Sequence, residues 1–252
     1  MVDRHQTTTT QSKKVEVVKL KSPIRLVLYG GARSIGDNGA FFHASKNVIS
    51  DYKNDLPIKS YFISGGIKQF IELINSQPAN SVQSLDIFGH GSEKGFYTVI
   101  GASMSKNLTS EEVYSKNLAS NLYRSIATKA NQWEVRGAGN WSNLFTISDI
   151  NFNVFTNESK IEIHGCNTAN EGIILDTFSS KLSQGLFSAG KSRSIVIGHA
   201  DYTNPNRGGT KEISKQDYRH GLRIVYNNGK IILKTRQEGR ISANSIKKAL
   251  GG

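Results

Sequence analysis

The chain has 252 residues, of which 37% are hydrophobic, which is enough for one sizeable α/β domain or two small ones. It contains no run of about 18 apolar residues, so we expect no transmembrane segment. The N-terminus lacks the apolar core of a secretory signal peptide, and we expect a cytoplasmic protein or one delivered into a target cell without Sec export. Its only cysteine, Cys166, excludes an intramolecular disulfide and any cysteine-rich metal site.

The formal charge of +12 is unevenly distributed along the chain. Residues 1–22 carry five Lys/Arg against two Asp/Glu, and residues 207–252 carry eleven against three, so the segment between them is nearly neutral. A basic C-terminal region beside a neutral body predicts an anionic partner, such as nucleic acid, a membrane surface or an acidic protein. The alternative is a basic surface that serves only solubility.

Residues 1–22 are rich in Thr, Lys and Gln, which predicts a flexible arm ahead of a folded domain spanning residues 23–252. From Pro23 onward, short β-branched runs bounded by glycine alternate with segments of helical spacing. The runs expected to form strands are 24–29, 58–63, 84–88, 160–164 and 194–198, and the expected helices are 40–54, 66–76 and about 172–184. This alternation predicts an α/β fold with an open, mostly parallel sheet and helices on both faces.

Two segments depart from the alternation. Residues 92–158 contain a helix-like stretch at 110–131 and a glycine- and aromatic-rich stretch at 133–141, which we interpret as an insertion over the end of the sheet. A lid, a substrate-binding flap and plain decoration are all compatible with it. Residues 222–236 form two β-rich runs around Asn228-Gly229 and predict an antiparallel hairpin near an edge of the sheet.

Two of the predicted strands end in a polar residue flanked by glycine. His90 follows the strand 84–88 between Gly89 and Gly91, and Cys166 follows the strand 160–164 after Gly165. The carboxyl ends of parallel strands share one edge of a sheet, so His90 and Cys166 are expected to lie close together. Glycine also allows a substrate chain to approach the backbone.

These motifs, FGHGSEKGF and HGCNTANEG, resemble those of the caspase-like (clan CD) cysteine peptidases, and are most similar to bacterial, toxin-associated members. The resemblance covers residues 24–202 in element order. It implies a caspase-like fold and a peptidase that hydrolyses proteins or peptides through an acyl-enzyme, without a cofactor. The thiolate of Cys166 would attack the scissile carbonyl, His90 would protonate the leaving amine, and the backbone N–H groups of Gly91 and Cys166 would bind the oxyanion.

The resemblance also implies an effector or toxin protease, or a self-processing domain. In the family, the segment after the strand that follows the cysteine helps to shape the primary specificity pocket. This segment contains Asp201 and Tyr202, and the carboxylate of Asp201 would suit a basic substrate side chain. Three other acidic residues remain alternatives for a place near the site: Asp149, Glu171 and Asp176. The chain departs from caspases in its longer insertion and in the sequence after Cys166.

Two other classes of protein compete with the peptidase. His90, His164 and His199 all follow or end predicted strands, and three histidines are a known zinc set, so a metal-dependent hydrolase is an alternative. A non-catalytic caspase-like binding module with a basic surface is the other, since a fold does not prove activity. In that case Cys166 would be a small core residue.

Overall fold

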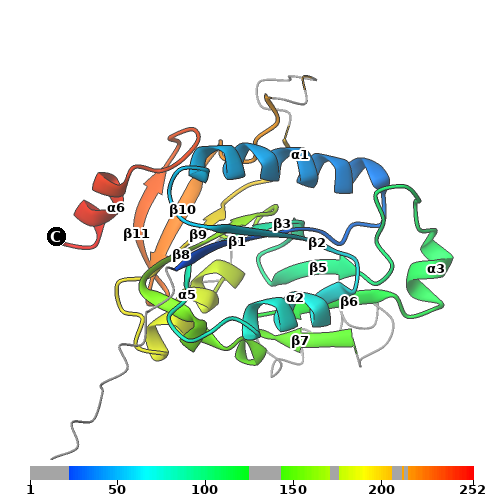
Figure 1. Ribbon diagram of the computed structural model, residues 1–252, viewed down its shortest axis with the longest axis horizontal. Helices are drawn as coiled ribbons and strands as arrows, with labels where there is room; N and C mark the ends of the chain where they lie inside the picture. Colours follow the sequence, from blue (N-terminus) through cyan, green and yellow to red (C-terminus); the bar gives the residue numbers. More distant parts are fainter. Residues whose placement is uncertain (1–22, 125–142, 171–175, 206–211, 213–214) are drawn as a thin grey trace, which may run out of the picture.

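The computed structural model describes residues 23–124, 143–170, 176–205, 212 and 215–252 (Figure 1). Its centre is a seven-stranded sheet with the spatial order β11-β10-β9-β8-β3-β1-β2. The strands, in chain order, are β1 (Ile24–Gly30), β2 (Ile58–Ile63), β3 (Val82–Phe88), β8 (Phe155–His164), β9 (Ile195–His199), β10 (Arg223–Asn227) and β11 (Lys230–Thr235). All neighbours from β2 to β9 are parallel, whereas β10 is antiparallel to both β9 and β11. The predicted α/β fold with a mostly parallel sheet and a C-terminal hairpin is confirmed.

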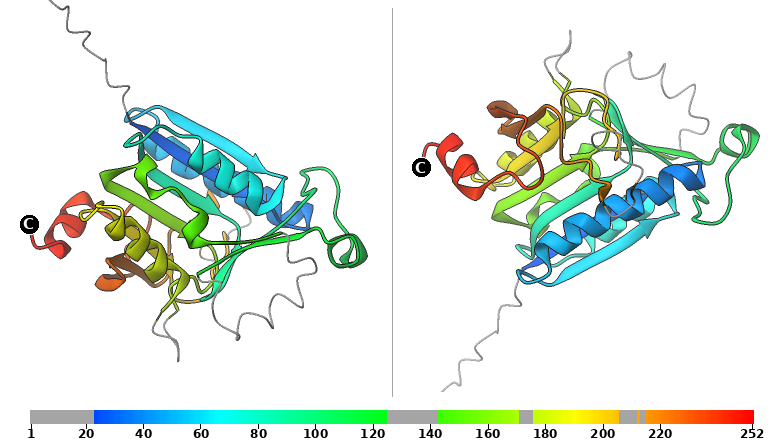
Figure 2. Two further views of the ribbon diagram at one scale, coloured as in Figure 1. Left: turned by 90° about the horizontal axis from the view of Figure 1, so that it is seen from below. Right: turned by 90° about the horizontal axis from the view of Figure 1, so that it is seen from above.

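Helices cover both faces of this sheet (Figure 2). On one face lie α2 (Gly66–Asn75) and α5 (Phe178–Ser188), which bury Phe70, Phe178 and their apolar neighbours against the sheet. On the other face lie α1 (Ile35–Tyr52) and the short C-terminal α6 (Ala243–Ala249). Burial of these apolar side chains supplies most of the driving force for folding.

A second sheet has four strands in the order β4-β5-β6-β7, and its first strand begins two residues after the end of β3. Its strands are β4 (His90–Gly91), β5 (Gly95–Val99), β6 (Ala119–Tyr123) and β7 (Leu144–Thr146), and the 3-10 turns η2 (Ile147–Asp149) and η3 (Phe152–Val154) lead into β8. Because β4 begins at His90 and pairs with β5, the insertion fixes the backbone of this histidine. The insertion is therefore part of the scaffold of the candidate site.

Two predicted helices differ from the observed ones. The helix predicted at 110–131 is wrong over the described residues 110–124: α3 (Ser110–Tyr114) is one short turn, and the chain then forms β6, whereas residues 125–131 lie outside the described residues. Asn117 adopts a positive φ of 56°, which ends the helix, and β5 and β7 provide the hydrogen-bond partners that keep β6 extended.

Two other helices have boundaries that differ from the predicted ones. The helix predicted at 40–54 begins earlier, at Ile35, because Ser34 caps it by accepting a hydrogen bond from the Asp37 amide. The described part of the helix predicted near 172–184 begins at Phe178, after the N-cap Thr177. The predicted arm 1–22, the stretch 133–141 and Glu171 lie outside the described residues.

The basic C-terminal region is only partly a surface feature. Arg219 and Arg223 are buried and paired with carboxylates, whereas Lys234, Lys247 and Lys248 are exposed. Among the described residues, no helix is both long and apolar enough to cross a membrane.

Candidate active site

The register of two neighbouring strands brings His90 and Cys166 to the same edge of the sheet. Strands β3 and β8 are parallel neighbours, and Phe88 is paired with His164 at their carboxyl ends. His90 and Cys166 each lie two residues beyond this pair, one on each chain. The sequence-based expectation that the two motifs meet at one edge of the sheet agrees with this register.

The glycines of the two motifs are in direct backbone contact. A methyl group at Gly165 would lie 2.9 Å from the carbonyl oxygen of Gly89 and 3.4 Å from the amide nitrogen of Gly91. A methyl group at Gly91 would lie 3.3 Å from the carbonyl oxygen of Cys166. Such approaches are closer than ordinary van der Waals contact, so glycine is needed for the two strand ends to lie side by side.

The imidazole of His90 is half exposed and is held by α1. Its Nε2 lies 3.3 Å from Oδ2 of Asp37, and its ring makes an edge contact with Phe41 at a centroid distance of 5.4 Å. The hydrogen bond from His90 is the largest cause that lowers the pKa of Asp37, against an opposing effect of burial. One ring nitrogen thus has a carboxylate partner, and the other remains for a reacting group.

The thiol of Cys166 is partly buried against the segment that follows β9. Its Sγ lies 3.3 Å from the carbonyl oxygen of Thr203 and 3.5 Å from the Thr203 amide nitrogen, and the amide of Asn167 donates to the carbonyl oxygen of Asp201. Asp201 is exposed, and Tyr202 is 88% exposed. The structure therefore places both predicted substrate-binding residues beside Cys166, with side chains open to solvent.

Two of the three other acidic residues considered from the sequence have structural partners, and the third, Glu171, lies outside the described residues. Asp149 accepts hydrogen bonds from Thr146, and Asp176 forms an ion pair with Lys181.

A buried tyrosine completes the surroundings. Tyr218 packs against Phe41 and Phe88, with centroid distances of 5.9 and 6.2 Å. Burial raises the pKa of Tyr218, and the nearby Cys166 and Asp37 raise it further, so its hydroxyl stays protonated.

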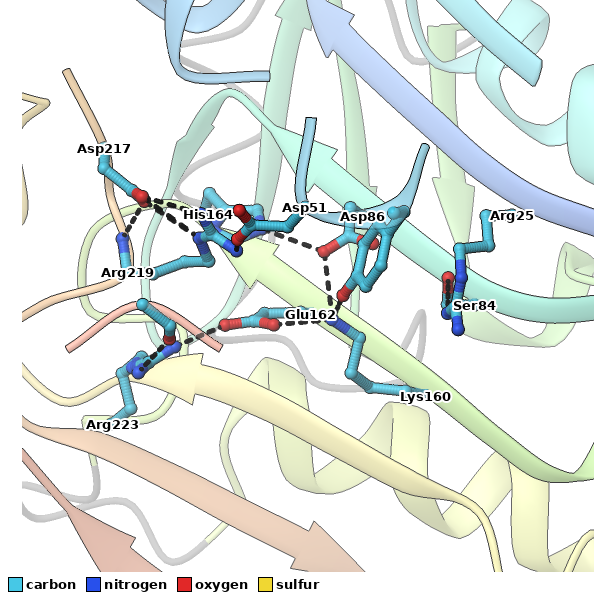
Figure 3. Close-up of polar contacts among 12 residues, drawn as sticks. Arg25, Asp51, Ser84, Asp86, Lys160, Glu162, His164, Asp217, Arg219 and Arg223 are labelled. Atoms are coloured by element: carbon cyan, nitrogen blue, oxygen red, sulfur yellow. Dashed lines mark hydrogen bonds and ion pairs between the residues drawn. The ribbon is translucent and has the colours of Figure 1, made fainter. Parts of the chain in front are cut away.

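Beneath this site, the face of the sheet that meets α1 carries a row of buried charged side chains (Figure 3). Lys160 lies between two carboxylates, with its Nζ 3.2 Å from Asp86 and 2.7 Å from Glu162, and it also donates to the Tyr52 hydroxyl. Glu162 reaches Arg223 at 2.7 Å through its other oxygen. The row therefore pairs each buried charge with at least one opposite charge, as burial requires.

The protonation states in this row follow from burial and pairing. Burial is the largest single effect and opposes ionisation, but Lys160 and His164 together, with Arg223 also acting on Glu162, keep the pKa of Asp86 and Glu162 lowered. In return, these carboxylates raise the pKa of Lys160. For His199, desolvation together with the nearby His164 and Arg223 outweighs the opposing effect of Glu162 and lowers the pKa to about 3, so His199 is neutral at neutral pH.

The three histidines of the zinc alternative do not form a ligand set in the described structure. His164 is buried, stacked on Phe88 at 4.1 Å, and its Nε2 lies 3.2 Å from Asp86, whereas His90 is turned toward Asp37. Within the described ranges, the candidate metal-ligand cluster consists of Asp86, Glu162 and His164. The Lys160 ammonium already bonds both of these carboxylates, so a metal ion would have to displace it.

Sequence reasoning did not find Asp37, Phe41 and Tyr218, because they come from a helix and a loop distant in the chain. It also treated the strand before Cys166 as apolar and missed the buried charges. The alternation of Lys160, Glu162 and His164 with two isoleucines was the available signal for a polar face. Comparison with known proteins adds no further guide: no protein-family model matches this chain, and neither does any curated protein.

Proposed function

We propose that this chain is a caspase-like cysteine endopeptidase with Cys166 as nucleophile and His90 as general acid. One observation supports the proposal, namely the register that pairs Phe88 with His164, with close backbone approaches at Gly91 and Gly165 just beyond that pair. A sheet edge with a thiol, an imidazole and approachable backbone amides is what acyl transfer requires.

In the proposed reaction, the Cys166 thiolate attacks the scissile carbonyl carbon and forms a C–S bond. The oxyanion of the tetrahedral intermediate is bound by the backbone N–H groups of Gly91 and Cys166. The C–N bond then breaks as His90 gives a proton to the leaving amine, which yields an acyl-enzyme. A water molecule gives a proton to His90 and attacks the acyl carbon, and the C–S bond breaks to release the carboxylic acid and regenerate the Cys166 thiolate and the protonated His90.

The segment 201–203 is the proposed wall of the substrate site. It contacts Cys166 through Thr203, while Asp201 and Tyr202 remain open to solvent and available to a substrate chain. The carboxylate of Asp201 favours a basic side chain next to the cleaved bond. The resemblance to toxin-associated peptidases extends the proposal to an effector or self-processing role, and the exposed lysines near the C-terminus suit an anionic partner.

The first test is alkylation of the thiol. Because Cys166 is the only cysteine, mass spectrometry of the intact protein measures its reaction with iodoacetamide without ambiguity. We expect the native protein to react faster than the same chain unfolded in guanidinium, and His90→Ala to react more slowly than the wild type. A native thiol that no electrophilic peptide probe labels would argue for the non-catalytic binding module.

The second test is turnover. A peptide library should be cleaved by the wild type and left intact by Cys166→Ala, and the cleaved sequences report the specificity. Activity that survives in Cys166→Ala and is lost to a chelator would contradict the thiol mechanism and favour a metal. If His90→Ala kept near wild-type turnover, His164 or His199 would replace His90 in the assignment.

A further inference from the structure

Two side chains of α1 hold the imidazole of His90 from two directions. Asp37 and Phe41 are four residues apart and therefore lie on one face of the helix. Asp37 faces Nε2 at 3.3 Å, and Phe41 contacts the ring at an interplanar angle of 79°. Phe41 is itself buried against Tyr218, so it offers a fixed surface.

Several side-chain hydrogen bonds anchor the beginning of α1. Asn38 is fully buried, and its side chain accepts from the Ala32 amide and donates to the carbonyl oxygens of Ala32 and Ser103. Ser34 caps the helix, and the Ile35 amide donates to the side chain of Asn107. These bonds tie α1 to the loop after β1 and to the segment before α3, so the position of Asp37 is set by the fold.

We infer that Asp37 is a positioning residue for His90 and orients its ring for proton transfer at Nδ1. This inference rests on the proposed function of His90 as general acid. The first turn of α1 would thereby supply a third member of the site.

The geometry explains how a carboxylate at Nε2 of His90 would assist proton transfer at Nδ1. With Nε2–H donated to Asp37, Nδ1 is the nitrogen available to the leaving amine and to water. When Nδ1 gives up its proton, the neutral ring that remains keeps its hydrogen on Nε2, which is the form that Asp37 binds. The ring therefore keeps one orientation through both half-reactions, and its rotamer need not be restored in each cycle.

The contact itself can be tested without any activity. The pKa of the Asp37 carboxyl is measured by carbon-detected NMR in the wild type and in His90→Gln. Because the hydrogen bond from His90 lowers the pKa of Asp37, we expect this pKa to rise in His90→Gln. An unchanged pKa would mean that the contact does not form in solution, and would overturn the inference.

Turnover tests the role in proton transfer. Asp37→Ala should lower kcat roughly 10- to 100-fold while leaving KM within about 3-fold, because the lost interaction acts on the reacting step and not on binding. Asp37→Asn retains an oxygen that accepts from Nε2 and should recover part of kcat. Glu72→Gln on α2 is the control, since it removes an exposed carboxylate paired with Lys68 and should behave as the wild type.

Folding is checked by the unfolding midpoint of each variant. If Asp37→Ala folds and its kcat stays within twofold of the wild type, Asp37 has no positioning role. If the wild type cleaves no peptide, the proposed function fails, and the titration of Asp37 still decides whether the contact exists.

Discussion

His199 permits a quantitative test of how burial controls the chemistry beneath the site. It is 2% exposed, and desolvation lowers its pKa from an ordinary 6.5 to about 3. The folded protein therefore leaves His199 neutral over a range in which the unfolded chain binds a proton. Below about pH 6.5 this difference favours unfolding, and the loss of stability grows until the pH reaches the folded pKa.

The size of the effect follows from linkage. Between the folded and the unfolded pKa of His199, each pH unit below the unfolded value lowers the free energy of unfolding by about 1.4 kcal/mol. At pH 5, His199 lies about 1.5 units below its unfolded pKa, so it lowers the free energy of unfolding by about 2 kcal/mol relative to pH 7.5. The lowered pKa of Asp86 and Glu162 also reduces stability in acid, but only as the pH falls through roughly 4 and below.

The assay is urea unfolding of the wild type and of His199→Gln at pH 7.5 and pH 5. The substitution changes stability at both pH values by whatever the new side chain costs, so only the pH dependence is compared. We expect the wild type to lose about 2 kcal/mol more than His199→Gln between the two conditions. His43→Gln on α1 controls for the replacement of a histidine outside the buried row. Parallel losses in the wild type and His199→Gln would refute the assignment of a neutral, desolvated His199.

Two further predictions concern the packing of the site. Arg223→Met leaves Glu162 with one cationic partner fewer in a buried position, and should lower the free energy of unfolding by about 3–5 kcal/mol in urea titrations. Adding Glu162→Gln to it should recover part of this loss, and a single variant as stable as the wild type would contradict the pairing. Gly165→Ala puts a methyl 2.9 Å from the carbonyl oxygen of Gly89, and should slow Cys166 alkylation at least roughly 10-fold by separating the strand ends. Gly39→Ala, where a methyl meets no atom within 4 Å, should react as the wild type does.

Local patterns in the sequence determined most of the central sheet. Strand β2 coincides with its prediction, and the other predicted strands of the sheet differ by a few residues at their ends. Short β-branched runs bounded by glycine have few other stable conformations, so a local signal is sufficient for them. The sequence was also sufficient to predict that His90 and Cys166, which follow glycines, lie at one edge of the sheet. Strands β3 and β8 are parallel neighbours, so their carboxyl ends share that edge.

Local patterns were not sufficient where the tertiary structure supplied the decisive contacts. The segment 119–123 has enough helical spacing to predict a helix, but it pairs with β5 on one side and with β7 on the other and is therefore a strand, β6. Tertiary context overrides propensity when the long-range hydrogen bonds and burial outweigh a small local preference.

The surroundings of the candidate dyad were decided by the tertiary structure alone. Asp37 precedes His90 by 53 residues, and nothing in either local sequence indicates that they meet. Their contact depends on the crossing of α1 over the sheet and on the anchoring of its first turn by Asn38. The sequence by itself determined which two strand ends carry the candidate catalytic side chains, whereas the packing of α1 and the loop around Tyr218 determined what surrounds them.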